Sequence, residues 1–139
     1  LPHPEENLTT YRQLSRAIQQ GAVRTAQDCS EGGVAVAVAE MCIGGRLGAN
    51  IDVDGTGDAD LWSRLWGESL GRFVVAVAPD QETNFLKTMA GHPTTVLGRV
   101  TEDAVFHVTD GHDAVIHLET DSMVHAWQAT LAMGGASDE

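Results

Sequence analysis

The residues best suited to chemistry lie in one short polar stretch, residues 28–33 (DCSEGG), directly followed by a run of small apolar residues. Gly32 and Gly33 carry no Cβ, so another group can approach the backbone of this turn closely. If a helix begins behind the turn, with Ser30 as its N-cap, its free N–H groups attract a phosphate or a carboxylate. The stretch therefore predicts an anion-binding turn at a helix N-terminus. A plain helix–sheet connection is the alternative, because glycine pairs are common in turns.

A second polar stretch, residues 67–72 (GESLGR), stands just before an apolar run. It places the carboxylate of Glu68 and the guanidinium of Arg72 beside two glycines. These two side chains either form an ion pair that fixes the loop or border a bound ligand, and the sequence leaves both interpretations open.

No other pattern predicts a catalytic or metal site. The six histidines are scattered, and a two-residue hairpin loop at 111–112 would place His107 and His117 on opposite faces of the strand pair. Zinc needs three or four converging ligands, so we expect no metal site. The acidic turn at 52–58 lacks the glycine and the closing glutamate of an EF-hand. Nucleophile elbows, Walker loops and dinucleotide fingerprints are also absent from the sequence, so we expect no catalytic residue here.

Composition narrows the class of protein. At 139 residues the chain predicts a single domain, 1–139, with a linker at 1–5 and a tail at 133–139, and its start indicates a piece of a longer protein. The net charge of −12, with eight scattered Lys and Arg, argues against binding to nucleic acid or an anionic membrane. A phosphate would have to be held by a helix N-terminus, one arginine or a bridging metal. The sequence contains no signal peptide or membrane-length apolar run, and two cysteines fit free thiols in a cytoplasmic protein.

The elements expected around these stretches alternate between helices and strands. Apolar spacing and terminal glycines predict helices at 6–20, 34–43, 60–66, 79–91 and from 121 onward. The run 34–43 alternates Val and Ala, but its length and alanine content favour a helix that is buried nearly all round. Strands are expected at 22–27, 47–53, 73–78 and 94–100, and 105–109 with 114–118 form a hairpin. This order predicts an α+β or α/β fold, with a mixed β-sheet covered by helices.

Two segments of the chain resemble one enzyme family. Residues 26–41 (AQDCSEGGVAVAVAEM) are similar to the HDxSxGGLAVALAE stretch of phosphoribosylformylglycinamidine synthases, and residues 65–75 (LWGESLGRFVV) to their LFxESxxRFVV stretch. Residues 98–101 (GRVT) resemble the IGxV strand that follows. The resemblance runs from about residue 22 to residue 131, and it is to the C-terminal half of the second AIR-synthase-like unit of those enzymes. Gln27 stands where the family commonly has histidine, which removes a possible general base.

The resemblance implies a function in purine biosynthesis. Those enzymes are ATP-dependent ligases that convert formylglycinamide ribonucleotide to formylglycinamidine ribonucleotide with Mg-ATP and ammonia from glutamine. The partners implied are the N-terminal and first-unit domains of the same synthase and a glutaminase domain or subunit. This domain would wall a nucleotide or phosphate cleft and be inactive alone.

The resemblance also implies where a ligand would bind. Matching motifs place Asp28, Ser30, Glu31, Gly32 and Gly33 at a phosphate or ribose pocket, bordered by Glu68, Ser69 and Arg72. Two alternatives remain open. The chain resembles, over its glycine turn, other ATP-using enzymes of the same fold, such as thiamine-monophosphate kinase and a hydrogenase-maturation dehydratase. It is also compatible with a purely structural domain.

Overall fold

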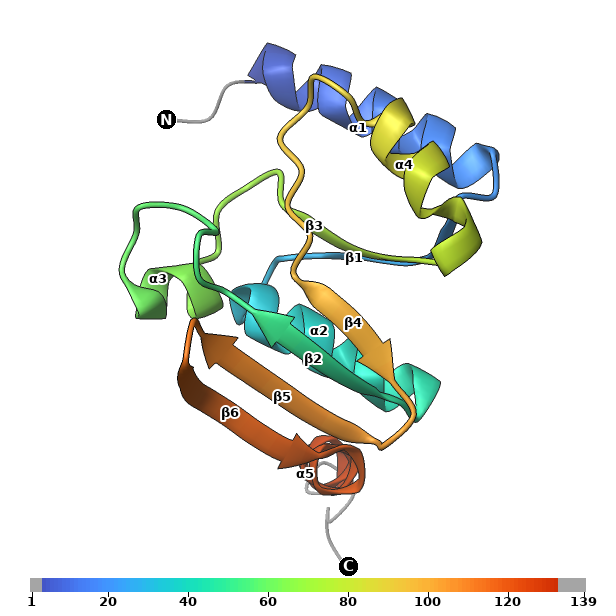
Figure 1. Cartoon of the computed structure of the whole chain (residues 1–139). Coiled ribbons are helices and arrows are strands. Elements are labelled where there is room, and N and C mark those ends of the chain that lie inside the picture. Colours follow the sequence, from blue (N-terminus) through green and yellow to red (C-terminus); the bar gives the residue numbers. More distant parts are fainter. Residues whose placement is uncertain (1–3, 133–139) are drawn as a thin grey trace, which may run out of the picture. The chain divides into compact units, whose positions relative to one another are not determined.

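The structure is a computed structural model that describes residues 4–132, so the predicted tail at 133–139 and the first part of the linker lie outside the described residues. The chain divides into two compact units. Unit 1 contains the residues up to Ala37 together with Trp66–Val96, and unit 2 contains Val38–Leu65 together with the residues from Leu97 onward. The order of helices and strands is the one the sequence predicts (Figure 1).

Unit 1 is a two-stranded ribbon covered by helices. Its elements are α1 (Pro4–Gln19), β1 (Val23–Asp28), β3 (Phe73–Val77), the 3-10 helix η1 (Pro79–Gln81) and α4 (Glu82–Thr88). β1 and β3 are antiparallel, and α1 and α4 lie side by side along them (Figure 1). α1 ends where Gly21 takes a φ of +74°, as predicted. The core of unit 1 consists of Leu14, Ala17, Ala22, Phe85 and Met89, with Val23, Val75 and Val77 packed against it.

Helix α2 (Gly33–Gly45) begins in unit 1 and ends in unit 2. Every residue from Gly33 to Ala39 is buried or half-buried, which confirms the helix expected from the Val/Ala run. The strand β3 is less buried than its apolar sequence indicates. Phe73 is 42% exposed, and the next four residues are half-buried, because the ribbon has only two strands.

Unit 2 is built on a four-stranded mixed sheet with the order β4-β2-β5-β6. The strands are β2 (Gly48–Asp52), β4 (Gly98–Thr101), β5 (Val105–Asp110) and β6 (Asp113–Glu119), and the helices are α3 (Leu61–Trp66) and α5 (Thr120–Ala132). β2 and β5 are parallel, whereas the other pairs are antiparallel. Alternate residues face a buried side of the sheet, namely Ala49, Ile51, Phe106 and Val108. The predicted mixed sheet with flanking helices is confirmed.

Two strand predictions are wrong in detail. The strand expected at 94–100 forms only from Gly98, where a Cβ would lie 1.9 Å from the Asn50 carbonyl oxygen, so only glycine permits this close pairing. His107 and His117 do not lie on opposite faces. The β5–β6 ladder shifts its register between Val108 and Thr109, and this shift makes His107 and His117 direct cross-strand partners on one face.

A half-buried ion pair joins α3 to the sheet of unit 2. The Arg64 guanidinium donates two hydrogen bonds of 2.9 Å to the Asp110 carboxylate and one of 2.6 Å to the Val53 carbonyl. The hydrogen bond to Asp110 raises the pKa of Arg64 above its ordinary value. Nearby, Asp52 accepts hydrogen bonds from the backbone N–H groups of Asp54 and Gly111, and these lower the pKa of the Asp52 carboxyl. No pattern in the sequence indicated this cluster.

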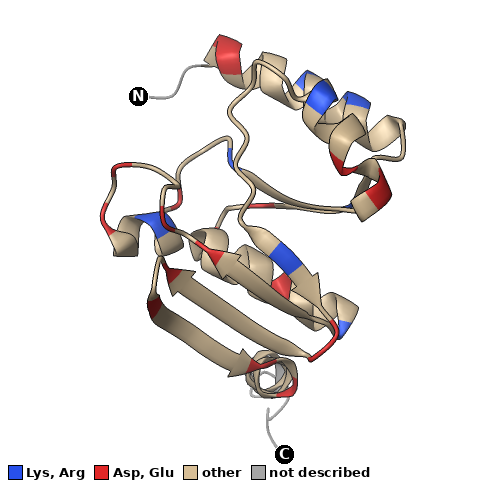
Figure 2. Cartoon of the chain, in the orientation of Figure 1, with Lys and Arg blue, Asp and Glu red and all other residues tan. Residues whose placement is uncertain are grey.

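The charged residues of the described structure are distributed as the composition indicates. Basic residues are few and separated over the described part of the chain, while acidic residues are spread over both units (Figure 2). None of the helices between residues 4 and 132 combines the length and the apolar character that spanning a bilayer requires. Both cysteines are buried free thiols.

Candidate functional site

The two polar stretches singled out in the sequence meet in unit 1. Their meeting follows from the antiparallel pairing of β1 and β3, in which Asp28 at the end of β1 lies opposite Phe73 at the start of β3. The Cys29 N–H continues this pairing with a 3.0 Å hydrogen bond to the Arg72 carbonyl. The glycine turn at 28–33 and the loop at 67–72 therefore lie at the same end of the ribbon.

The backbone of the glycine turn already holds an anion from its own chain. The Gly32 N–H donates a 3.1 Å hydrogen bond to Oε1 of Glu68, at the N-terminal end of α2. A carboxylate there is favoured both by the free N–H group and by the positive end of the helix dipole. Glu68 therefore occupies the kind of position that the sequence analysis predicted for an external phosphate or carboxylate.

The turn requires both of its glycines. Gly32 and Gly33 have φ angles of +76° and +62°, which side chains with a Cβ rarely adopt. A Cβ on Gly32 would lie 2.3 Å from Cγ2 of Val36, one turn further along α2. The helical hydrogen bonds start with the Val36 N–H, which donates to the Gly32 carbonyl.

The prediction that Ser30 is the N-cap is wrong. The left-handed glycines extend the turn, so α2 begins only at Gly33. The backbone carbonyl of Ser30, not its hydroxyl, accepts a hydrogen bond from the Gly33 N–H, at 3.2 Å. The Ser30 side chain is exposed, which leaves its hydroxyl open to a ligand.

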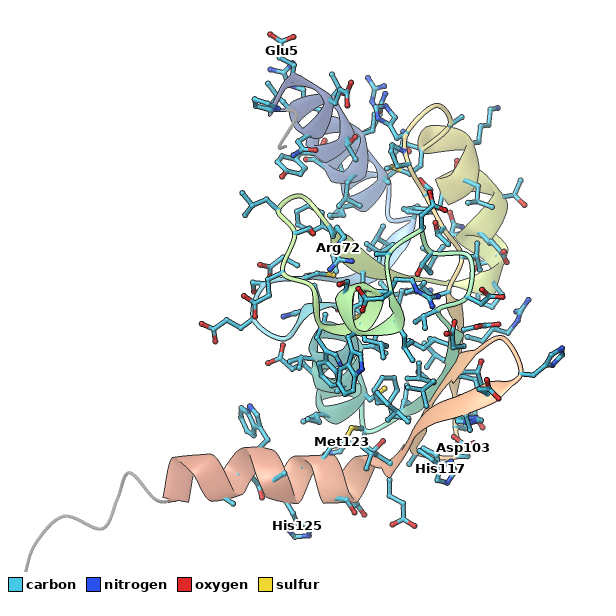
Figure 3. All side chains as sticks on the ribbon, turned by 90° about the vertical axis from the view of Figure 1, so that its left-hand side faces the viewer. Glu5, Arg72, Asp103, His117, Met123 and His125 are labelled. Carbon is cyan, nitrogen blue, oxygen red and sulfur yellow. The ribbon has the colours of Figure 1, made fainter. Side chains whose placement is uncertain are left out.

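Arg72 is half-buried and holds the loop through the backbone. Its guanidinium donates to the Gly67 carbonyl, and its Nε is buried without a hydrogen-bond partner among the described residues. Figure 3 shows the Arg72 side chain among the loops of this region. Within the part of the chain that the structure describes, Glu68 and Arg72 form no ion pair, so of the two open interpretations the ion pair does not hold.

The remaining predicted site residues surround this contact as exposed side chains: Asp28, Ser30, Glu31 and Ser69. With Glu68 the region has three carboxylates and one guanidinium, a balance that disfavours a bare phosphate and favours hydroxyl groups or a phosphate neutralised by a metal ion. No three His, Cys, Asp or Glu side chains of the described residues converge on a metal position. Burial raises the pKa of the Cys29 thiol, against a smaller lowering by Arg72, so this thiol is a poor nucleophile. The arrangement suits binding rather than covalent chemistry.

The contact between Gly32 and Glu68 was not predicted, although both residues were selected. The available signal was positional, because each polar stretch adjoins one end of a strand, and antiparallel pairing of those strands would join them. The sequence does not say which strands pair, so the signal was not sufficient.

The chain is similar in sequence and fold to one family of known proteins. Residues 1–111 match the family model described as AIR synthase related protein, C-terminal domain. The chain is 38% identical over 119 residues to the phosphoribosylformylglycinamidine synthase subunit PurL of Synechocystis, a match that covers 83% of the chain and 15% of that protein. The chain thus spans well under a fifth of the length of this curated relative.

Solved structures of Thermotoga maritima PurL are similar at 26% sequence identity. The complex with ATP has a TM-score of 0.74 over 83% of this chain and 21% of that chain. The complex with FGAR has a TM-score of 0.75 over 85% of this chain and 21% of that chain. These matches confirm the family resemblance and the fold expected from the sequence.

Proposed function

The chain belongs to the family of AIR-synthase-related proteins, within their C-terminal domain, and from this premise we propose that it serves an ATP-dependent ligase of purine biosynthesis. The whole protein converts formylglycinamide ribonucleotide, ATP and glutamine-derived ammonia to formylglycinamidine ribonucleotide, ADP and phosphate. The observation that carries the proposal is the 38% identity to PurL over 83% of the chain. PurL of Thermotoga maritima has been solved with ATP, with ADP and with FGAR, which supports these ligands.

In the proposed reaction, ATP transfers its terminal phosphoryl group to the glycinamide carbonyl oxygen of the substrate, releasing ADP. Ammonia then attacks the activated carbon, and phosphate leaves with the former amide oxygen. No residue of this chain is proposed to act in either step. The domain walls a nucleotide or phosphate cleft and is inactive alone.

The site in unit 1 is proposed to bind polar groups of the substrate or nucleotide. Glu68 and Asp28 accept hydrogen bonds from ribose hydroxyls, and the exposed Ser30 hydroxyl serves either as donor or as acceptor. A phosphate would compete with Glu68 for the Gly32 N–H, which lies 3.1 Å from the carboxylate. Carboxylates are also the ligands that Mg²⁺ prefers, so the negative charge of this region suits a magnesium ion that arrives with ATP and keeps its waters.

The proposed partners are the N-terminal and first-unit domains of the same synthase and a glutaminase domain or subunit. A Thermotoga maritima PurLQS structure, which matches 85% of this chain, supports an assembly of this kind. The proposed location is the cytoplasm, where the nucleotide substrates are made and used.

The test is ADP release by the full-length protein, measured with Mg-ATP and ammonia in the presence and absence of formylglycinamide ribonucleotide. We expect ADP to form only when the ribonucleotide is present. Folded protein that releases no ADP, with either ammonia or a glutaminase as nitrogen source, would contradict the proposal. Release stimulated by thiamine monophosphate or by a carbamoylated peptide would instead favour the kinase or the dehydratase of the same fold.

A further inference from the structure

One face of the four-stranded sheet in unit 2 has a polar row across its strands. Arg99 of β4 pairs with Asn50 of β2, Asn50 pairs with His107 of β5, and His107 pairs with His117 of β6. Residues at paired positions project to the same face, and the other face holds the buried Ala49 and Phe106. His107 is half-buried and His117 is exposed, so the face that carries them is open in this unit.

The two imidazole rings lie against each other at the open side of this row. Their ring centroids are 5.5 Å apart, and their planes cross at 76°. The register shift between Val108 and Thr109 creates this arrangement, since an unbroken ladder would have placed the rings on opposite faces. His107 also lines a shallow hollow of about 250 Å³ together with Asn50 and Thr109.

This spacing fits two ligands of one metal ion. A metal–nitrogen bond of about 2.0–2.1 Å, added to the ring's own radius, puts each centroid about 3.2 Å from the metal. At a tetrahedral angle the two centroids would then be about 5.2 Å apart. The separation of 5.5 Å in this structure is within a few tenths of an ångström of that value.

We propose that His107 and His117 form a binding site for a divalent late transition metal such as Zn²⁺, Ni²⁺ or Cu²⁺. Imidazole nitrogen suits these ions, whereas Mg²⁺ and Ca²⁺ prefer oxygen ligands. The described residues contain no group of three or more His, Cys, Asp or Glu side chains that could hold a metal. Water therefore completes the coordination.

Asp103 adds negative charge beside this pair. Its carboxylate accepts hydrogen bonds from the Thr101 hydroxyl at 2.6 Å and from the Val105 N–H at 3.2 Å, which fix its position. It lies close enough to His117 for their charges to interact, and Figure 3 shows both at the same end of the sheet. A carboxylate near a bound cation stabilises it electrostatically. His107, His117 and Asp103 all belong to unit 2.

The test is isothermal titration of the full-length protein with Zn²⁺ near neutral pH, comparing the wild type with His107→Asn and His117→Asn. Asparagine keeps a polar side chain at each position and removes the ring. His112→Asn and His125→Asn are matched controls, because both are exposed histidines of the same unit outside the pair. Circular dichroism verifies that each variant is folded.

We expect each variant of the pair to weaken one zinc-binding event at least tenfold and the two controls to leave it unchanged. X-ray absorption of the zinc-loaded protein should show two imidazoles that are lost in the double variant. Acidification should weaken this event in the wild type, since protons compete for the ring nitrogens. The proposal would be overturned if the double variant bound zinc as the wild type does, or if no event depended on His107 and His117.

Discussion

Replacing Gly32 by alanine tests the geometry of the glycine turn. At a φ of +76° an alanine pays about 1–2 kcal/mol for the left-handed backbone. Its Cβ would also lie 2.3 Å from Cγ2 of Val36, a stiff β-branched side chain in the first turn of α2. Overpacking of this kind costs about 1–3 kcal/mol. The expected loss in the free energy of unfolding is therefore about 2–5 kcal/mol.

Gly21→Ala is the matched control. Gly21 has nearly the same φ, +74°, but a Cβ there would meet no atom within 4 Å. The effect of alanine on the unfolded chain is common to both variants and cancels in the comparison. Urea unfolding should therefore show Gly32→Ala to be less stable than Gly21→Ala by about 1–3 kcal/mol.

A second variant shows whether Val36 is the cause. Val36→Ala removes both Cγ atoms and leaves Cβ as the nearest neighbour, at 2.8 Å, so part of the clash remains. In the double variant Gly32→Ala/Val36→Ala, the loss in the free energy of unfolding should be smaller than the sum of the two single losses, by about 1 kcal/mol. If Gly32→Ala were no less stable than Gly21→Ala, or if Val36→Ala gave no coupling, the assigned geometry of the turn would be wrong.

Three further predictions concern groups with defined surroundings. Hydrogen bonds from two backbone N–H groups lower the pKa of Asp52. The stabilisation that the ionised Asp52 carboxylate provides is therefore present above the ordinary carboxyl pKa and is lost as the pH falls through the lower pKa of the folded protein. Asp52→Asn should reduce the loss in the free energy of unfolding below about pH 4, as measured by urea unfolding. Burial raises the pKa of Cys29, so iodoacetamide should alkylate this thiol at least about tenfold more slowly in folded than in unfolded protein, as read by mass spectrometry of the labelled peptide. Asp110→Asn should lower the Tm by several degrees, because it leaves the Arg64 guanidinium without its anion in a position where the Arg64 side chain is only 12% exposed. The control variant Asp113→Asn, at an exposed residue, should leave the Tm unchanged.

The ends of helices were predictable from the sequence because glycines mark them. Gly21 and Gly91 both take positive φ angles at the ends of predicted helices, and this requirement is local to a few residues. The helical assignment of the Val/Ala run also rested on local information, its length and alanine content. Element order and class therefore followed from the pattern alone.

Features that depend on strand pairing were not predictable. The register shift in the β5–β6 ladder inserts one residue and so places both histidines on one face, although the turn residues were recognised. The Gly32–Glu68 contact depends on the pairing of β1 with β3, which joins residues 36 positions apart. The error at Ser30 has a similar origin, because the two left-handed glycines postpone the helix start beyond the expected cap.

The central claim is that the site around Glu68 and the glycine turn binds substrate or nucleotide in the working enzyme. The most direct measurement is the steady-state kinetics of the full-length protein with Glu68→Gln, which removes the charge at the Gly32 N–H, against the control Glu82→Gln. Glu82 is an exposed acidic residue in the first turn of α4, in the same unit. We expect Glu68→Gln to change the KM for ATP or for formylglycinamide ribonucleotide at least fivefold with the Tm nearly unchanged, and Glu82→Gln to change neither. Identical kinetics for both variants and the wild type, in folded protein, would contradict the claim and leave the domain a structural one.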